Sequence, residues 1–479
     1  MNTHEIGQSL FKAADALRGK FDAAALGEIL LPLFFLKYVS GVHPEGLAGK
    51  RGRFSIPSEA RFEFLLQQCR LPGNAKRIAA ALQGLEKANE GLAGAFAGSR
   101  FAPVEIPEDS ARDQALGEAI ATLAQLDLHH SSIRAEEPAE ALRKLVTTFP
   151  PDLTSYAGEL YTPPQVMDLL TQLAAPKPGE ALYDPACGAG GFLFNSADSI
   201  RTHNPAARYS LWGQDSTPKL LRFAKMSALL RGETEFQFAA DDIFMMPFLG
   251  EDHKLRQFEV IVSNPPFSAA FSDAQWAAVL EDRFGQFKRG RPPRARADYG
   301  YILHMIESMN PQTGRIATIA PRGAQFREGS EADIRQNLVE TNLLDAVIGL
   351  PPKLFQHTEI PAVILVFRAE RKDDRVLFID ASREFDLGRK SNELRSKDLE
   401  RIITTYRLRL EMPDYSRVVS RQEIASHAYN LNISPYLNTA PQEPRVDLRS
   451  LEHTQRELYG ELDQVRKRIE SLLDQFLGA

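Results

Sequence analysis

The segment Asn264-Pro265-Pro266-Phe267 offers the most specific chemistry in this sequence. It follows the apolar run 258–262, which predicts a buried strand ending at a proline break. An exocyclic amine on a planar ring is a poor nucleophile, but the Asn264 side-chain oxygen and the Pro265 carbonyl could accept its two N–H hydrogens. The prolines stiffen the loop, and Phe267 offers a flat face for an extruded base. The pattern favours methylation of a planar amine; the alternative is a proline-rich turn without a catalytic role.

A glycine-rich turn is the second candidate site. Residues 181–185 predict a short strand, and residues 186–191 form a turn before a predicted helix. Glycines let a backbone approach a ligand closely, and open α/β sheets bind cofactors at the carboxyl ends of strands. The spacing does not match the dinucleotide fingerprint, and no Gly-Lys-Ser/Thr follows as in a P-loop. The turn therefore indicates a cofactor of another kind.

Two further predicted strands, 210–215 and 236–242, end in acidic residues. Asp215 follows the glycine-rich turn at about the spacing where an acid binds a pair of ribose hydroxyls. Asp241 and Asp242 end the next strand. Each element alone could be structural. Their order, with the Asn-Pro-Pro-Phe segment last, favours a single site along one edge of a sheet.

In these motifs the chain resembles the S-adenosylmethionine-dependent N6-adenine DNA methyltransferases. More narrowly, it resembles the modification subunit of type I restriction–modification systems. The narrower resemblance covers nearly the whole chain and rests on residues 33–38, 158–164, 184–192, 349–355, 360–365 and 429–434. One departure is Asp215, where the family more often has Glu; the shorter acid should still reach a ribose.

The resemblance implies an α/β fold, with a Rossmann-like S-adenosylmethionine-dependent methyltransferase sheet, an N-terminal helical domain and a C-terminal helical tail. It implies transfer of a methyl group to N6 of a flipped adenine in double-stranded DNA. In the catalytic segment, Asn264 and Pro265 would orient the amine, Pro266 would stiffen the loop, and Phe267 would stack on the base. The residues expected to bind S-adenosyl-L-methionine are Tyr161, Thr162, Asp184, Ala186, Gly188, Gly190, Asp215, Asp241 and Asp242.

Within that set, the glycine-rich turn would form the cofactor floor, and Asp215 would bind the ribose. Asp242, with Asp241 as the second choice, would face the adenine of the cofactor. Tyr161 and Thr162 would close over the methionine end. No metal is expected, because the sulfonium is already a strong electrophile.

Composition excludes several classes of protein. The 479 residues suffice for two or three domains. The two cysteines, Cys69 and Cys187, lack ligand-like spacing, which argues against a disulfide framework or a zinc site and for a reducing compartment. Cys187 could be a nucleophile, although packing under the cofactor is the favoured interpretation. Without a signal peptide or an apolar run of membrane-spanning length, we expect a soluble, cytoplasmic protein.

The charge of the chain bears on its partners. The formal net charge is −6, whereas a stand-alone DNA binder usually has a basic surface. The basic run 288–296 follows the catalytic segment; it is either a solvated loop or, as its place favours, a contact to DNA phosphates. A single basic loop does not recognise a particular DNA sequence, so we expect another chain to select the DNA target. The resemblance points to a specificity subunit binding two copies of this chain, with a restriction (nuclease/translocase) subunit as a further candidate.

The chain divides into three parts. Residues 1–150 show helical periodicity, and residues 151–437 alternate strand-like and helix-like segments as in a doubly wound sheet. Runs 363–367 and 376–380 are two late strands that could form an antiparallel pair. Residues 438–479 carry a heptad stripe from Leu448 to Phe476, which either packs on its own domain or contacts a partner helix. The resemblance favours a partner.

Two other functions are compatible with the motifs. Asn-Pro-Pro-aromatic segments also serve enzymes that methylate the side-chain amide of glutamine in proteins. Those enzymes have no obvious use for the basic run or the tail. A non-enzymatic subunit that binds the cofactor only as an effector is the other alternative, and the complete segment 264–267 argues against it.

Overall fold

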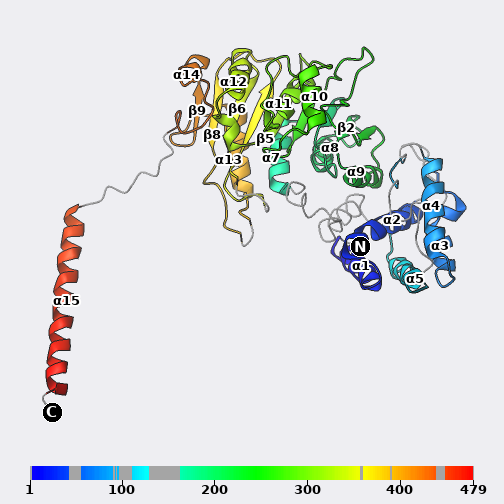
Figure 1. The fold of residues 1–479 in the computed structure, drawn as a ribbon, viewed down its shortest axis with the longest axis horizontal. Coiled ribbons are helices and arrows are strands. Elements are labelled where there is room, and N and C mark those ends of the chain that lie inside the picture. The colour runs from blue at the N-terminus through cyan, green and yellow to red at the C-terminus, as the bar shows by residue number, and fades with distance from the viewer. Residues whose placement is uncertain are drawn as a thin grey trace. The chain divides into compact units, whose positions relative to one another are not determined.

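The computed structural model describes residues 3–42, 55–89, 92, 94–96, 110–128, 162–355, 360–388, 391–437 and 448–477. Residues 1–437 form one compact unit and residues 438–479 a second. Figure 1 draws the described residues of both units as coloured ribbons. Among the described residues, no helix combines the length and apolar character needed to cross a membrane.

The first part of the larger unit is helical. Its elements are α1 (Thr3–Leu17), α2 (Ala23–Val42), the 3-10 helix η1 (Ser58–Ala60), α3 (Phe62–Gln68), α4 (Asn74–Ala88) and α5 (Ser110–Ala124). Helix α2 is apolar on nearly all sides, and it is accordingly buried in the middle of a common core. Phe223, Met226 and Leu230 of α9 (Pro218–Leu230) belong to the same core. The helical part therefore packs on a helix that follows the second strand of the sheet.

The described residues form one nine-stranded sheet with the order β3-β2-β1-β4-β5-β7-β6-β8-β9. The strands are β1 (Ala181–Asp184), β2 (Ser210–Gln214), β3 (Phe236–Ala239), β4 (Val260–Ser263), β5 (Arg315–Pro321), β6 (Leu344–Gly349), β7 (Ala362–Arg368), β8 (Val376–Asp380) and β9 (Ser416–Val419). Strands β3, β2, β1, β4 and β5 are mutually parallel. The predicted α/β methyltransferase-type sheet is confirmed.

The pairing expected for the late strands is wrong. β7 is antiparallel, but it lies between β5 and β6, and β8 pairs in parallel with β6. β9 then adds as an antiparallel edge strand on β8. Residues 362–367 are buried, as expected for a strand with neighbours on both sides. The apolar run identifies β7 as a buried strand but does not specify its neighbours.

Helices cover both faces of the sheet (Figure 1). Helices α7 (Pro164–Ala174), α8 (Gly191–His203), α9 and α13 (Ser396–Leu408) share one apolar core with the strands. A second core contains residues of α10 (Asp273–Glu281), α11 (Asp298–Glu307), η3 (Arg322–Gln325), α12 (Ser330–Glu340) and α14 (Arg421–Ser426). The smaller unit contains α15 (Leu448–Leu477). Because β1 to β4 are parallel, the acids and the Asn-Pro-Pro-Phe segment that follow them meet at one edge.

Candidate active site

Asn264 follows directly after β4, and within the described residues its side-chain amide is hydrogen-bonded at the nitrogen but not at the oxygen. The Nδ2 group donates a hydrogen bond to Thr162 Oγ1 at 3.0 Å. The Oδ1 atom is buried and has no hydrogen-bond partner in the described part of the chain. One Nδ2 hydrogen is donated to Thr162, so Oδ1 is the hydrogen-bonding atom of the amide that remains without a partner in this part of the chain. A buried acceptor without a partner is costly, so a ligand that donates an N–H would relieve it.

Phe267 forms one wall beside this acceptor. Its ring is partly exposed and meets the buried Phe355 ring edge to face, with centroids 6.0 Å apart and planes at 77°. Phe355 ends the stretch 349–355, which contributed to the family resemblance, yet sequence reasoning gave it no role. An aromatic residue at the end of that stretch was the available signal. The two rings come from loops after β4 and β6, at the same edge of the sheet.

The glycine-rich turn has the backbone that its sequence requires. Gly188 and Gly190 have φ of 53° and 84°, in the left-handed region. A Cβ added to Gly190 would come within 2.5 Å of the Phe194 ring, so a larger residue there would also clash. The amide of Cys187 donates to the Gln214 carbonyl at 2.9 Å. The turn between β1 and α8 is therefore fixed against the end of β2.

Asp184 lies fully buried beneath this turn. Its Oδ1 accepts hydrogen bonds from Ser263 Oγ at 2.7 Å and from the Ala186 amide at 3.0 Å. Its Oδ2 is buried without a hydrogen-bond partner among the described residues. Burial raises the pKa of Asp184 to about 7, although the hydrogen bonds from Ser263 and Ala186 act in the opposite direction. The unpartnered oxygen is suited to a cationic or N–H-donating ligand.

Asp215 has a structural contact in addition to the role expected for it. Its Oδ2 accepts from the Gly188 amide at 3.0 Å, and its Oδ1 accepts from the Thr217 amide at 2.8 Å. Burial raises its pKa despite these bonds. The carboxylate thus ties the glycine-rich turn to the end of β2. Each carboxylate oxygen can accept a second hydrogen bond, so this tie is compatible with ribose binding.

The two acids after β3 differ in their surroundings. Asp242 Oδ1 accepts from the Phe244 amide at 2.8 Å, and its Oδ2 accepts from Gln275 Nε2 at 2.6 Å. Asp241 is partly exposed beside it. Because both oxygens of Asp242 are engaged by the protein, the choice between the two acids as the contact to the cofactor's adenine stays open.

Of the remaining candidate residues, the structure describes Thr162 and Cys187. Tyr161 lies outside the described residues, and Thr162 is hydrogen-bonded to Asn264. Cys187 is buried, and desolvation followed by the nearby Asp215 and Asp184 raises its thiol pKa well above the usual value, which favours packing over nucleophilic attack. No cluster of residues able to hold a metal occurs in the part of the chain that the structure describes.

The basic run lies against the segment that follows Phe267. The Phe271 amide donates to the Arg294 carbonyl at 3.0 Å, and the Ala297 amide donates to the Ala269 carbonyl at 2.7 Å. Two arginines of the run are paired, Arg289 with Glu307 and Arg294 with Asp273. The exposed residues of the run are Lys288, Arg291, Arg294, Ala295 and Arg296. The run therefore presents cations next to the catalytic segment.

A mixed sheet whose first five strands are parallel, with the glycine-rich turn, the acids and Asn264 at their carboxyl ends, has the architecture of a Rossmann-like methyltransferase. The family model described as N-6 DNA Methylase matches residues 140–444, and the model described as the HsdM N-terminal domain matches residues 6–123. The chain belongs to the N-6 DNA methylase family, which confirms the resemblance seen in its motifs. The glutamine methyltransferase alternative gains no support from these matches.

The chain is similar to several relatives within that family. It is 28% identical over 345 residues to the type I restriction enzyme MpnII methylase subunit of Mycoplasma pneumoniae, covering 70% of this chain and 63% of the relative. It is also 28% identical over 367 residues to the MjaVII methylase subunit of Methanocaldococcus jannaschii, covering 74% of this chain and 60% of the relative. The matched region thus spans less than two thirds of the length of these curated relatives.

A solved structure gives a similar result. The type I restriction–modification methyltransferase subunit from Streptococcus thermophilus is 26% identical, with a TM-score of 0.78. The match covers 91% of this chain and 100% of that chain.

Proposed function

We propose that this chain is the catalytic modification subunit of a type I restriction–modification complex. It transfers a methyl group from S-adenosyl-L-methionine to N6 of an adenine flipped out of double-stranded DNA. One observation carries the proposal. Two buried oxygens, Asn264 Oδ1 and Asp184 Oδ2, have no hydrogen-bond partner among the described residues, and Ser263 links the two residues that bear them. Ser263, the neighbour of Asn264, donates its hydroxyl to Asp184 at 2.7 Å. An amine acceptor thus lies beside a carboxylate suited to a cationic cofactor.

Asn264 and Pro265 prepare the amine for attack. The Asn264 Oδ1 atom and the Pro265 carbonyl accept the two N–H hydrogens, which localises the nitrogen lone pair. Thr162 fixes the orientation of the Asn264 amide, because its hydroxyl oxygen accepts from Nδ2. Neither acceptor is basic enough to keep a proton, so both groups orient the amine and do not act as bases, and the proton that the nitrogen loses on methylation passes to water. The bound S-adenosyl-L-methionine supplies an electrophilic methyl group on a sulfonium.

The residues around the glycine-rich turn fit that cofactor. Asp184 is buried and Asp215 is half-buried, and desolvation raises the pKa of both carboxyl groups, which favours a ligand of positive charge. Ala186, Gly188 and Gly190 let the backbone approach it closely. In this proposal Asp215 binds the ribose, Asp242 or Asp241 faces the adenine, and Tyr161 and Thr162 lie towards the methionine end.

The flipped base would occupy the space beside Phe267. Phe267 stacks on the base, and Phe355, which meets it edge to face, supports that wall. The basic run beside the catalytic segment contacts the DNA phosphates flanking the flipped nucleotide. A DNA substrate also makes the cytoplasm the expected location.

The remaining partners follow from the charge and from the names of relatives. The curated relatives are named as methylase subunits of type I restriction enzymes. We assign residues 1–150 to an N-terminal helical domain, 151–437 to the catalytic domain and 438–479 to a partner-contact helix. In this arrangement a specificity subunit binds two copies of the chain and selects the DNA target, and a restriction subunit can join the complex.

The test is the variant Asn264→Ala. It should lower the rate of methyl transfer by about 10²–10³, in analogy with the loss of one oxyanion donor. Cofactor affinity should stay within about threefold, since Asn264 contacts the substrate amine and not the donor. A tritium-transfer assay on DNA and calorimetry with S-adenosyl-L-methionine measure the two quantities.

The matched control is Asn310→Ala. This asparagine is also partly buried, donates through Nδ2 to Glu259 at 2.9 Å, and precedes β5, at the opposite end of the strands from the catalytic segment. It should leave the rate of transfer near that of the wild type. Near wild-type turnover in Asn264→Ala would overturn the assignment of the catalytic segment.

A further inference from the structure

The backbone directly after Phe267 is held by the start of α11. Ser268 has φ of 52°, in the left-handed region that a residue with a side chain rarely adopts. Its amide donates to Asp298 Oδ1 at 2.7 Å. One residue further on, the Ala269 carbonyl accepts from the Ala297 amide at 2.7 Å. Two consecutive residues of the loop are therefore bonded to the first turn of one helix.

The second oxygen of Asp298 has a different partner. Asp298 is 4% exposed, and its Oδ2 forms an ion pair with Arg327. Arg327 also donates through Nε to the buried Glu331 at 2.6 Å. The guanidinium thus lies between two buried carboxylates, with Asp298 bridging from it to the catalytic loop. Arg327 follows η3, which leaves the sheet after β5, the strand next to β4.

This bridge acts on the residue that would stack on the base. The Ser268 amide belongs to the same peptide group as the Phe267 carbonyl, so fixing it fixes the backbone on which the Phe267 ring turns. The position needs two acceptor atoms, one for the Ser268 amide and one for the Arg327 guanidinium. A carboxylate supplies both. An asparagine supplies one oxygen and turns a donor towards the other partner.

We propose that Asp298, held in place by Arg327, is a positioning residue that fixes the Asn264–Phe267 loop for its substrate. The substrate meant here is the flipped adenine, so the inference rests on the proposed function. Asp298 acts through the Ser268 peptide and does not touch the reacting atoms. Without the Asp298 carboxylate, the loop would keep its hydrogen-bond acceptors, but these atoms would no longer be held in fixed positions.

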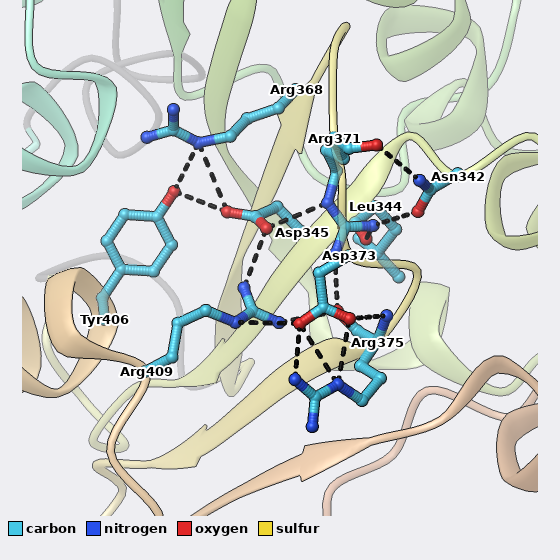
Figure 2. A network of polar contacts seen from close by, with 9 residues as sticks. All are labelled: Asn342, Leu344, Asp345, Arg368, Arg371, Asp373, Arg375, Tyr406 and Arg409. Carbon is cyan, nitrogen blue, oxygen red and sulfur yellow. Dashed lines mark hydrogen bonds and ion pairs between the residues drawn. The ribbon is translucent and has the colours of Figure 1, made fainter.

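The chain offers a matched control at the other edge of the sheet. Asp345 is 6% exposed and lies near the start of β6, so it is far along the strands from their carboxyl ends. Figure 2 shows it among several arginines: it pairs with Arg371 and Arg409, each at 3.0 Å, and accepts from Tyr406 at 2.7 Å. Asp298→Asn and Asp345→Asn therefore make the same change in two buried ion pairs, only one of which holds the loop.

The first measurement is backbone amide exchange on the full chain, and it requires no activity. In Asp298→Asn, exchange in residues 264–272 should become at least about tenfold faster, as expected for a lost charge-assisted hydrogen bond. Exchange in these residues should stay at the wild-type rate in Asp345→Asn. Cofactor affinity of Asp298→Asn should stay within about threefold of the wild type. Unchanged exchange in Asp298→Asn would overturn the proposal.

The second measurement is single-turnover methyl transfer at saturating cofactor and DNA, in complex with the specificity subunit. Asp298→Asn should slow it at least about tenfold, since small misplacements of reacting groups are costly. Arg327→Lys, which keeps the charge but not the two-sided fork, should fall between the wild type and Asp298→Asn and provides a milder variant. An equal slowing in Asp345→Asn at equal loss of melting temperature would reduce Asp298 to general stability and overturn the proposal.

The two measurements separate this inference from the proposed function. If the wild-type complex methylates no DNA, the proposed function fails. The amide exchange of residues 264–272 would still report whether Asp298 holds the loop.

Discussion

At the scale of single residues, one buried carboxylate of the candidate site, Asp184, has an oxygen without a hydrogen-bond partner in the described part of the chain. Asp184 is fully buried, its Oδ2 has no partner among the described residues, and its pKa is raised to about 7. A bound cation would favour the ionised carboxylate and lower this pKa again. Cofactor binding should therefore be linked to the release of a proton from Asp184.

This linkage predicts a pH-dependent cofactor affinity. Because the pKa of free Asp184 is about 7, affinity should rise as pH increases from about 5 to about 7, by at most about tenfold per pH unit. Above that range the affinity should level off. Calorimetry in buffers of different ionisation enthalpy measures both the affinity and the protons released. Asp184→Asn should bind more weakly and lose this pH dependence; a wild-type affinity that is flat across the range would contradict the role of Asp184.

The stability of the free protein should respond in the opposite direction. The folded pKa of Asp184 lies above its unfolded value of about 3.9, so this residue's contribution is fully present below the unfolded pKa. That contribution is lost as pH rises towards the folded pKa of about 7. Added cofactor should consequently raise the melting temperature more at neutral pH than in mild acid.

The sequence predicts the kinds of residue in the site better than their contacts. Asn264 and Asp184 could be identified because their chemistry requires a particular type at the end of a strand. The bond from Asn264 to Thr162 joins residues separated by 102 positions, so only the folded chain brings them together. The Asp298 bridge was missed for the same reason: an acid at the start of a helix is common, and nothing local indicates its partners.

At the scale of elements, the glycine-rich turn depends on the neighbouring strand. Asp215 at the end of β2 accepts from the Gly188 amide, and the Cys187 amide donates to the carbonyl of Gln214, the last residue of β2. The parallel pairing of β1 with β2 places these groups opposite each other. The conformation of the proposed cofactor floor thus depends on two strands and not on the turn alone.

The variant Asp215→Ala tests this arrangement. Loss of charge-assisted hydrogen bonds of about 1.5–3 kcal/mol should lower cofactor affinity at least about tenfold, while the fold survives. Comparing cofactor analogues with and without the ribose hydroxyls separates the two roles of Asp215. If it binds the ribose, removing the hydroxyls should weaken binding to the wild type much more than to the variant. An unchanged dissociation constant for the intact cofactor would exclude Asp215 from the site.

Element predictions succeeded where periodicity and burial agree. The strands predicted at 181–185 and 210–215 are β1 and β2, and the predicted helix start after the glycine-rich turn is the start of α8. The partnership of β7 could not be deduced, because a buried apolar run is equally suited to several positions inside a sheet. Its place between β5 and β6 depends on the packing of the whole sheet.

At the scale of the whole molecule, the helical part is joined to the cofactor-binding part through α9. Lys219 on α9 pairs with Glu28 on α2 at 2.6 Å, and the Tyr38 hydroxyl donates to the Leu230 carbonyl at 3.3 Å. Helix α9 begins three residues after Asp215. The element that carries the helical part is thus the one that continues from the proposed ribose-binding residue.

The smaller unit contains a long helix, α15, to which the proposed catalysis gives no role. Helix α15 spans 30 residues, about 45 Å at 1.5 Å per residue. Among its described side chains, the stripe residues Leu458, Leu462, Val465 and Ile469 are each more than half exposed. Their three- and four-residue spacing is that of a seam for a partner helix. The chain has a net charge of −6, and its basic run lies near segment 264–267, so we expect a second chain to read the DNA sequence.

Deleting residues 446–479 should therefore weaken assembly with a specificity subunit and leave cofactor binding within about threefold of the full chain. The isolated full chain should bind cofactor but methylate a defined DNA site poorly, and adding the specificity subunit should restore activity with two copies of this chain per partner. Size-exclusion chromatography with light scattering measures the assembly.

Replacing Leu458, Leu462, Val465 and Ile469 with alanine should weaken assembly as the deletion does, whereas alanine at Arg466 and Lys467, which lie off the stripe, should not. Assembly of the truncated chain as tight as that of the full chain would show that α15 is not the partner contact, and efficient methylation of a defined site by the chain alone would show that no partner is required.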